Sequence, residues 1–267
     1  MSNNYSNIIE VKDVSIGYSN KKDTFIVSKN INFSSKKSEL ISIVGTNGIG
    51  KSTLLKTLAR IQPQKKGTIL LNNKNFYDYS TLEIATQLSI VLTESPSSKN
   101  LTVKELVSLG RHPYTNWIGI LTVIDEKIIE ESLIDTDTLS LVNKKCSELS
   151  DGQLQRVMIA RALVQDTPII LLDEPTTHLD IYHRAYILKL LKNLADKKKK
   201  TIIFSTHEID LAIQVSHKMI VMTKEKTYFD KPEMLIKSGC FKNLFPSETI
   251  EFDNELKQFI LKNNNVS

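Results

Sequence analysis

The strongest chemical signal in the sequence is a glycine-rich segment that ends in a lysine and a serine. It consists of Gly45, Thr46, Asn47, Gly48, Ile49, Gly50, Lys51 and Ser52, which satisfy the spacing G-x-x-x-x-G-K-[ST]. Glycines let backbone N–H groups turn inward around phosphate oxygens, and a helix that begins near Lys51 adds its positive dipole end. From an exposed helix start, Lys51 can reach the β and γ phosphates of a nucleotide, and Ser52 can ligate magnesium. The spacing therefore predicts a phosphate-binding loop rather than a glycine-rich surface turn.

An acidic pair, Asp173 and Glu174, follows the apolar run Ile169–Leu172. Open α/β sheets bind their ligands at the carboxyl ends of strands, so this position suits a phosphate site. We expect Asp173 in the magnesium shell. We expect Glu174 to orient and polarise the water that attacks the γ phosphate, because phosphoryl transfer needs mainly positioning and charge stabilisation. Taken alone, such a pair is usually only the solvated end of a strand.

A second potential anion site is the sequence Leu-Ser-Asp-Gly-Gln at 149–153. Ser150 or Asp151 is a suitable cap for the helix that follows Gly152, and the simplest interpretation gives them only that role. A helix N-terminus with a serine hydroxyl can also bind a phosphate. The position of this segment, after the phosphate loop and before Asp173, favours the second role.

The elements that must hold these residues alternate between strands and helices. We expect strands at 8–11, 14–18, 25–33, 40–44, 67–71, 169–172 and 201–204. We expect helices at 52–60, from Gly152 to a break at 166–168, and at 181–195. Strands separated by helices predict a wound α/β sheet.

The segment 101–149 has a different character, with few strand signals. Thr102 can cap a helix that runs through Leu109, and Asp125 can start another that runs through Leu133. We therefore expect a mostly helical insert in the middle of the chain.

Composition excludes several classes of protein. The chain has 267 residues, of which 40% are hydrophobic, with only 9 Gly and 7 Pro, so a collagen-like or low-complexity chain is excluded. Its apolar runs are too short to cross a bilayer, and its first ten residues lack the features of a secretory signal, so we expect a cytoplasmic protein. The length allows one large domain or two small ones.

The cysteines and charges indicate little specialised chemistry. Cys146 and Cys240 lie far apart with no further ligand cluster, so reduced thiols are expected rather than a disulfide or a zinc site. The formal charge of +5 is scattered in small groups. The lysine run 197–200 follows an amphipathic stretch, which favours a solvated face over a nucleic-acid groove.

Together these motifs, in this order, resemble the ATP-binding subunits of ABC transporters over nearly the whole chain. The resemblance implies an α/β fold of the P-loop NTPase type with a parallel-sheet core, an N-terminal antiparallel β subdomain and a helical subdomain. It also implies one domain, 1–267, in which the helical subdomain is inserted at about 95–150 and 225–267 forms a short C-terminal tail. The implied cofactors are ATP and Mg²⁺.

The resemblance assigns roles position by position. Tyr18 stacks on adenine, Asp180 belongs to the D-loop at 177–180, and His207 is the switch histidine that touches the γ phosphate. The residues assigned to ATP are Tyr18, Gly45, Thr46, Asn47, Gly48, Ile49, Gly50, Lys51, Ser52, Thr53, Thr93, Glu94, Ser150, Gly152, Gln153 and Asp180. Those assigned to catalysis are Glu174 and His207, and those assigned to the metal are Ser52 and Asp173.

Two positions depart from the family pattern. Asp151 stands where the signature motif usually has its first glycine, which adds a negative charge near a phosphate site but keeps the backbone N–H. The glutamine of the Q-loop is also replaced. Thr93 by ungapped spacing, or Glu94 one residue on, would make its contact to magnesium or water.

A narrower resemblance concerns the segments 101–114 and 180–183, which are similar to those of importers of ferric siderophores, haem and vitamin B12. The resemblance to the wider family implies a homodimer that completes each ATP site with 45–52 of one chain and 150–153 of the other. It also implies permease subunits in the membrane, docked on 101–114 and the Thr93-Glu94 loop, and indirectly a substrate-binding protein. The chain would then sit in the cytoplasm at the inner face of the cell membrane. Alternatively, the Gly-Arg-x-Pro element within 101–114 simply ends a helix.

Three other functions fit the residues less well. An ABC ATPase of another transporter type would share the whole ATP site. A nucleic-acid-associated ABC ATPase would call for a long heptad insert or a second cassette, and neither is present, so no nucleic-acid partner is expected. A small P-loop kinase would leave 149–153 and His207 unexplained.

Overall fold

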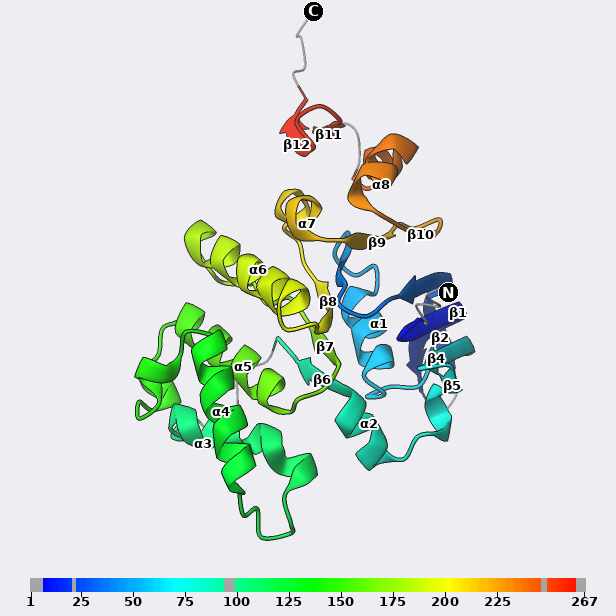
Figure 1. The fold of residues 1–267 in the computed structure, drawn as a ribbon. Coiled ribbons are helices and arrows are strands. Elements are labelled where there is room, and N and C mark those ends of the chain that lie inside the picture. Colours follow the sequence, from blue (N-terminus) through cyan, green and yellow to red (C-terminus); the bar gives the residue numbers. More distant parts are fainter. Residues whose placement is uncertain (1–6, 21–22, 94–98, 246–248, 263–267) are drawn as a thin grey trace, which may run out of the picture.

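A six-stranded sheet with the order β10-β9-β3-β8-β7-β6 organises the fold (Figure 1). The computed structural model describes residues 7–20, 23–93, 99–245 and 249–262. The strands of this sheet are β3 (Leu40–Gly45), β6 (Leu88–Val91), β7 (Ile169–Leu172), β8 (Thr201–Ser205), β9 (Lys218–Met222) and β10 (Thr227–Asp230). All neighbours pair in parallel except β10, which runs antiparallel to β9 at one edge. The predicted parallel core is confirmed.

A second sheet, with the order β2-β1-β4-β5, is antiparallel and confirms the predicted N-terminal β subdomain. Its strands are β1 (Ile9–Ser19), β2 (Thr24–Ser35), β4 (Lys66–Leu71) and β5 (Lys74–Asn75). The two strands predicted at 8–11 and 14–18 are one strand. Its register with β2 shifts between Val11 and Val14, and Asp13 there has a φ of 50°. Such an irregularity interrupts the apolar alternation, which is why the sequence reads as two strands.

Eight α-helices connect and cover the sheets within the described residues. They are α1 (Lys51–Leu58), α2 (Thr81–Gln87), α3 (Val103–Ser108), α4 (Val123–Asp135), α5 (Asp151–Val164), α6 (Ile181–Asp196), α7 (Ile209–Val215) and α8 (Pro232–Ser238). Short 3₁₀ helices are η1 (Phe76–Asp78), η2 (Leu109–Tyr114), η3 (Leu139–Leu141), η4 (Cys146–Glu148) and η5 (Cys240–Asn243). The strands β11 (Ile250–Asp253) and β12 (Gln258–Leu261) form a separate hairpin.

Alternate residues of the central strands face two different cores, as the period of two in a strand requires. In β7, Ile170 and Leu172 pack with α5, α6 and the helical insert. Ile169 and Leu171 pack with α1 and the N-terminal sheet on the other face. Each of these four side chains is at most 1% exposed. Burial on both faces explains the uninterrupted apolar run in the sequence.

The helical insert at 101–149 is confirmed, and its helices begin at threonine caps. Thr102 caps α3 as predicted. The α-helix ends at Ser108 rather than at Leu109, and the 3₁₀ helix η2 follows directly. The predicted start of α4 at Asp125 is wrong, because Thr122 is the cap and Asp125 is the third residue of a capping box. The insert lies on the far side of the central sheet from the N-terminal sheet (Figure 1).

Buried Arg111 joins two parts of the insert by an ion pair and holds them against α5 by a hydrogen bond. Arg111 Nε donates to Asp125 Oδ1 at 2.7 Å, and Arg111 Nη1 donates to the carbonyl oxygen of Val164 at 3.0 Å. Gly110 lies against the same helix, because a Cβ there would stand 2.3 Å from the carbonyl oxygen of Arg161. The Gly-Arg-His-Pro element therefore serves packing through its first two residues.

The segment 225–267 contributes to the main fold through β10 and then forms α8, η5 and the hairpin β11–β12. The hairpin packs its aromatic side chains near η5, and the Phe241 and Phe252 rings stack with centroids 4.8 Å apart. Within the part of the chain described, no helix is long and apolar enough to span a bilayer.

We predict that Arg111→Met destabilises the fold by about 3 kcal/mol, because it leaves the Asp125 carboxylate buried without its guanidinium partner. Urea unfolding measures the loss. Hydrogen bonds from Thr122, assisted by Arg111, hold the pKa of Asp125 below its usual range. The carboxylate is therefore charged at neutral pH. The loss should be fully present above the ordinary aspartate pKa of about 4 and should shrink as the pH falls from there through the lowered pKa of Asp125.

The control is Lys104→Met, which removes an exposed ion pair with Glu126 and should cost less than about 1 kcal/mol. Equal losses for the two variants would show that the buried contacts of Arg111 stabilise the fold no more than an exposed ion pair does.

Candidate functional site

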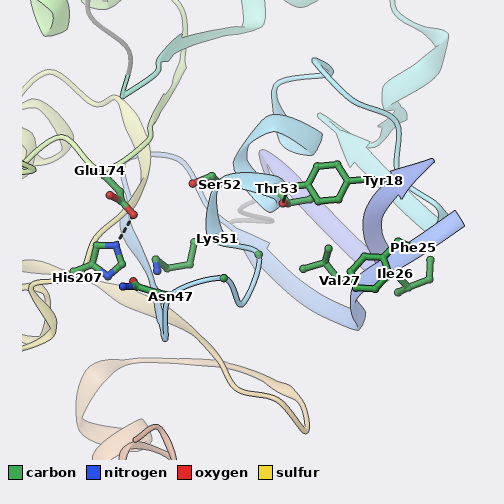
Figure 2. Close-up of a pocket in the computed structure, with 12 residues that line it drawn as sticks. Tyr18, Phe25, Ile26, Val27, Asn47, Lys51, Ser52, Thr53, Glu174 and His207 are labelled. Carbon is green, nitrogen blue, oxygen red and sulfur yellow. Dashed lines mark hydrogen bonds and ion pairs between the residues drawn. The ribbon is translucent and has the colours of Figure 1, made fainter. Parts of the chain in front are cut away.

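A cavity of about 650 Å³ opens where the phosphate loop meets the N-terminal sheet (Figure 2). The lining residues are Tyr18, Phe25, Ile26, Val27, Asn47, Gly48, Gly50, Lys51, Ser52, Thr53, Glu174 and His207. Tyr18, Phe25 and Val27 lie at the opposite end from Glu174 and His207 (Figure 2). Aromatic and charged groups are thus separated along one cavity, as a ligand with an aromatic base and a phosphate chain would require.

The phosphate loop joins the carboxyl end of β3 to α1. Gly48 has a φ of 76° and Gly50, the N-cap of α1, has a φ of 109°, a region that favours glycine. A Cβ on Gly50 would also stand 2.7 Å from Val27 Cγ1. The glycine at this position is therefore needed for both backbone conformation and space.

Lys51 is buried, so the prediction of an exposed helix start is wrong. Its side chain is folded over the loop, and Nζ donates to the carbonyl oxygens of Gly45 at 3.1 Å and Thr46 at 3.4 Å. Burial lowers the pKa of Lys51, and the nearby carboxylates of Glu174 and Asp173 partly oppose this. The ammonium group thus already lies inside the loop where phosphates would bind.

Asp173 is the point at which two serine hydroxyls converge. Ser52 Oγ donates to Asp173 Oδ1 at 2.9 Å, and Ser205 Oγ donates to the same oxygen at 2.7 Å. Ser205 Oγ also accepts from the backbone N–H of Glu174 at 2.9 Å. Ser205 is a positioning group that the sequence did not reveal, because its neighbours come from other strands. Its only signal was its place two residues before His207.

The oxygens of Ser52 and Asp173 suit magnesium, which prefers hard oxygen ligands. Among the residues described, no group of three or more His, Cys, Asp or Glu side chains could hold a metal. A site with few protein ligands fits a magnesium ion that takes its other ligands from substrate phosphates and water. The donor set is therefore compatible with the predicted metal.

Glu174 and His207 face each other across the end of the cavity, with His207 Nε2 2.6 Å from Glu174 Oε1 (Figure 2). Thr177 Oγ1 donates to the other carboxylate oxygen of Glu174 at 3.2 Å. Glu174 has a φ of 51°, which is strained for a residue with a side chain. Strain at a polar residue that lines a cavity is typical of a functional site.

Tyr18 lies at the other end, where its hydroxyl is 2.6 Å from Thr53 Oγ1. Its ring is 52% exposed and lines the cavity, so a planar base can stack on it. Phe25, on the paired strand β2, lines the same end and is 68% exposed. The sequence did not single out Phe25, because its position beside Tyr18 depends on the β1–β2 register.

Several predicted site residues do not line this cavity. Ser150 caps α5, and its hydroxyl accepts from the backbone N–H of Gln153 at 3.3 Å. The predicted residues outside the lining are Gly45, Thr46, Ile49, Thr93, Ser150, Gly152, Gln153, Asp173 and Asp180. Thr93 Oγ1 donates to the backbone oxygen of Asp173 at 3.1 Å, which places it beside the metal-binding candidate. Glu94 lies outside the described residues.

Comparisons with known proteins agree with this geometry. A profile described as ABC transporter matches residues 28–177. An uncharacterised ABC transporter ATP-binding protein of Methanocaldococcus jannaschii is 37% identical over 97% of this chain and 88% of its own length. The iron(3+)-hydroxamate import ATP-binding protein of Bacillus subtilis is 38% identical over 82% of this chain and 80% of its own.

Two solved structures are also similar. One, reported as an inward-facing metal-chelate type ABC transporter, is 26% identical with a TM-score of 0.78 and covers 90% of this chain and 89% of its own. The other is a dimeric post-hydrolysis state of an ATP-binding cassette bound to ADP and Pi. It is 29% identical with a TM-score of 0.72, over 84% of this chain and 98% of its own.

We predict that Lys51→Ala weakens nucleotide binding roughly tenfold to a hundredfold, because it removes charged hydrogen bonds to phosphate. The fold should survive, since within the described part of the chain the hydrogen bonds of Lys51 Nζ go only to loop carbonyls. Titration with ATP measures affinity, and circular dichroism checks the fold. Unchanged affinity would reject the assignment of this loop.

Proposed function

This chain belongs to the ABC transporter family of ATP-binding proteins, and we propose that it hydrolyses ATP to drive the uptake of an iron chelate, haem or a corrinoid through a membrane permease. The observation that carries the ATPase assignment is the cavity that brings Lys51, Glu174, His207 and Tyr18 together. Each of these residues can then act on a different part of the nucleotide.

The roles follow from position along the cavity. Tyr18 stacks on the base, and Lys51 with the loop N–H groups binds the phosphates. Glu174 accepts a proton from the attacking water, and His207 orients its carboxylate through the 2.6 Å contact. Ser52 and Asp173 would hold magnesium, which neutralises charge on the phosphate oxygens when bound.

We propose that two copies of the chain share each ATP. The Ser150 and Asp180 side chains are exposed and lie outside the cavity lining, so a single chain does not bring them to its own cavity. The N-terminus of α5 offers the partner's phosphate unpaired backbone N–H groups and a positive dipole end. Asp151, exposed in the first turn, reduces this attraction without removing those N–H groups.

The substrate class is supported by the relatives. Their names include a probable siderophore transport system ATP-binding protein of Bacillus subtilis and a petrobactin import ATP-binding protein of Bacillus anthracis. These are 37% and 36% identical over 89% and 86% of this chain. We therefore propose an iron chelate as the first candidate substrate. Haem and corrinoids belong to the same importer class.

The permease would dock on the helical insert, which places the chain at the inner face of the membrane. Within 101–114, Gly110 and Arg111 are buried against α5, whereas Leu109 and Tyr114 are 55% and 42% exposed. The exposed side chains of η2, with Trp117 in the loop that follows, are the better candidates for contact. Thr93 joins this side of the molecule to Asp173 through its hydrogen bond.

We predict that Glu174→Gln retains ATP binding but slows turnover by about 100-fold or more, because the amide fits the site and cannot act as a base. ATP should accumulate in a closed dimer. Size-exclusion chromatography with ATP and magnesium, beside a turnover assay, measures both effects. A monomer with normal hydrolysis would contradict the catalytic role of Glu174 and the shared site together.

We predict that a strain without this gene grows poorly when iron is supplied only as a siderophore or haem, or when a corrinoid is the sole source of vitamin B12. Growth on free salts should be normal. Radiolabelled uptake measures the defect directly, and a strain that carries Lys51→Ala should behave like the deletion. Normal growth and uptake on all three sources would reject the substrate class while the ATPase assignment remains.

A further inference from the structure

His183, in the first turn of α6, lies between two segments that the proposed function uses. Its backbone N–H donates to Asp180 Oδ1 at 2.9 Å, and its ring Nδ1 is 2.8 Å from Asp180 Oδ2. These two hydrogen bonds lower the pKa of Asp180, so its carboxylate is ionised at neutral pH. An ionised carboxylate only accepts hydrogen bonds, so Nδ1 of His183 carries the proton and donates.

The opposite edge of the same ring lies against Gly152, the second residue of α5. A Cβ on Gly152 would stand 2.7 Å from Cδ2, 3.2 Å from Cγ and 3.4 Å from Nε2 of His183. Gly152 is itself buried, so its backbone has no room to move away from the ring easily. The ring therefore acts as a spacer with Asp180 on one edge and Gly152 on the other.

The neighbouring residue, Arg184, ties this turn to the catalytic end of the cavity. Arg184 Nε donates to the carbonyl oxygen of Leu179 at 2.6 Å, and Nη1 donates to Glu208 Oε1 at 2.7 Å. Leu179 precedes Asp180, and Glu208 follows His207. The first turn of α6 thus contacts the start of α5, the segment before α6 and the loop of His207.

We propose that His183 is a positioning residue for ATP hydrolysis, whose ring sets the distance between Asp180 and the signature Gly152. The inference rests on the proposed function, in which both segments meet the ATP held by the partner chain. Two surfaces that contact the same ligand must keep a fixed spacing, since misplacement by about 1 Å can cost a hundredfold in rate. His183 does not line the cavity of its own chain, so its effect should fall on turnover.

The test is a double-mutant cycle on the full chain, with His183→Ala, Gly152→Ala and the double variant. Turnover number and ATP affinity are measured for each. We expect His183→Ala to lower turnover about tenfold with ATP affinity unchanged. Gly152→Ala should lower turnover strongly in the wild-type background, because the new methyl group displaces the ring. In the His183→Ala background the methyl group has room, so the further loss should be smaller than in the wild-type background, where the same methyl group also displaces the ring.

Two further variants test the bond to Asp180 and the packing on Gly152 separately. His183→Asn can still donate to Asp180 but leaves the space beside Gly152 empty, whereas His183→Phe fills that space and loses the bond. Each should lower turnover by less than His183→Ala. Lys189→Ala is the matched control, because Lys189 is exposed on the same helix, and it should retain normal turnover.

The inference is overturned if Gly152→Ala lowers turnover by the same factor in both backgrounds. It is also overturned if the turnover of His183→Ala lies within about twofold of wild type. If His183 only stabilised α6, Gly152→Ala would likewise lower turnover by the same factor in both backgrounds. Wild type and Lys51→Ala are assayed alongside. If hydrolysis depends on Lys51 but the substitutions at 152 and 183 affect turnover independently, only the role of His183 is rejected. Absence of such hydrolysis would reject the proposed function and the inference with it.

Discussion

The Asp173 carboxylate and its backbone hold the site together. Side-chain oxygens from α1 and β8, Ser52 and Ser205, donate to one carboxylate oxygen, and Thr93 donates to the backbone carbonyl. The backbone N–H of Asp173 donates to the carbonyl oxygen of Val91 at 2.9 Å. One residue at the end of β7 therefore connects the phosphate loop, the strand β6 and the strand β8. A nucleotide that moves Asp173 must move all three.

Local physics explains what the sequence could predict. The spacing of 45–52 requires left-handed glycines and a helix start, so it identifies the phosphate loop without any other part of the chain. The run Ile169–Leu172 predicts a doubly buried strand for the same reason. Non-local contacts account for what was missed. Ser205 matters because of Glu174, 31 positions away, and His183 because of Gly152, also 31 positions away. Phe25 is only 7 positions from Tyr18, but the register of β1 and β2 decides that the two are paired.

Two motifs changed meaning once they were placed in the fold. The Gly-Arg element looked like part of a surface motif, yet its glycine and arginine are buried against α5. The serine of 149–153 caps its own helix, which confirms the capping interpretation, and its role in phosphate binding stays a prediction.

The buried position of Lys51 has a consequence for the thermodynamics of binding. Burial lowers the pKa of its ammonium group, and phosphate oxygens placed beside that group would raise the pKa again. Nucleotide binding at alkaline pH should therefore be accompanied by proton uptake. Affinity should be greatest where Lys51 is protonated before the nucleotide binds, and it should decline as the pH rises above the lowered pKa of Lys51.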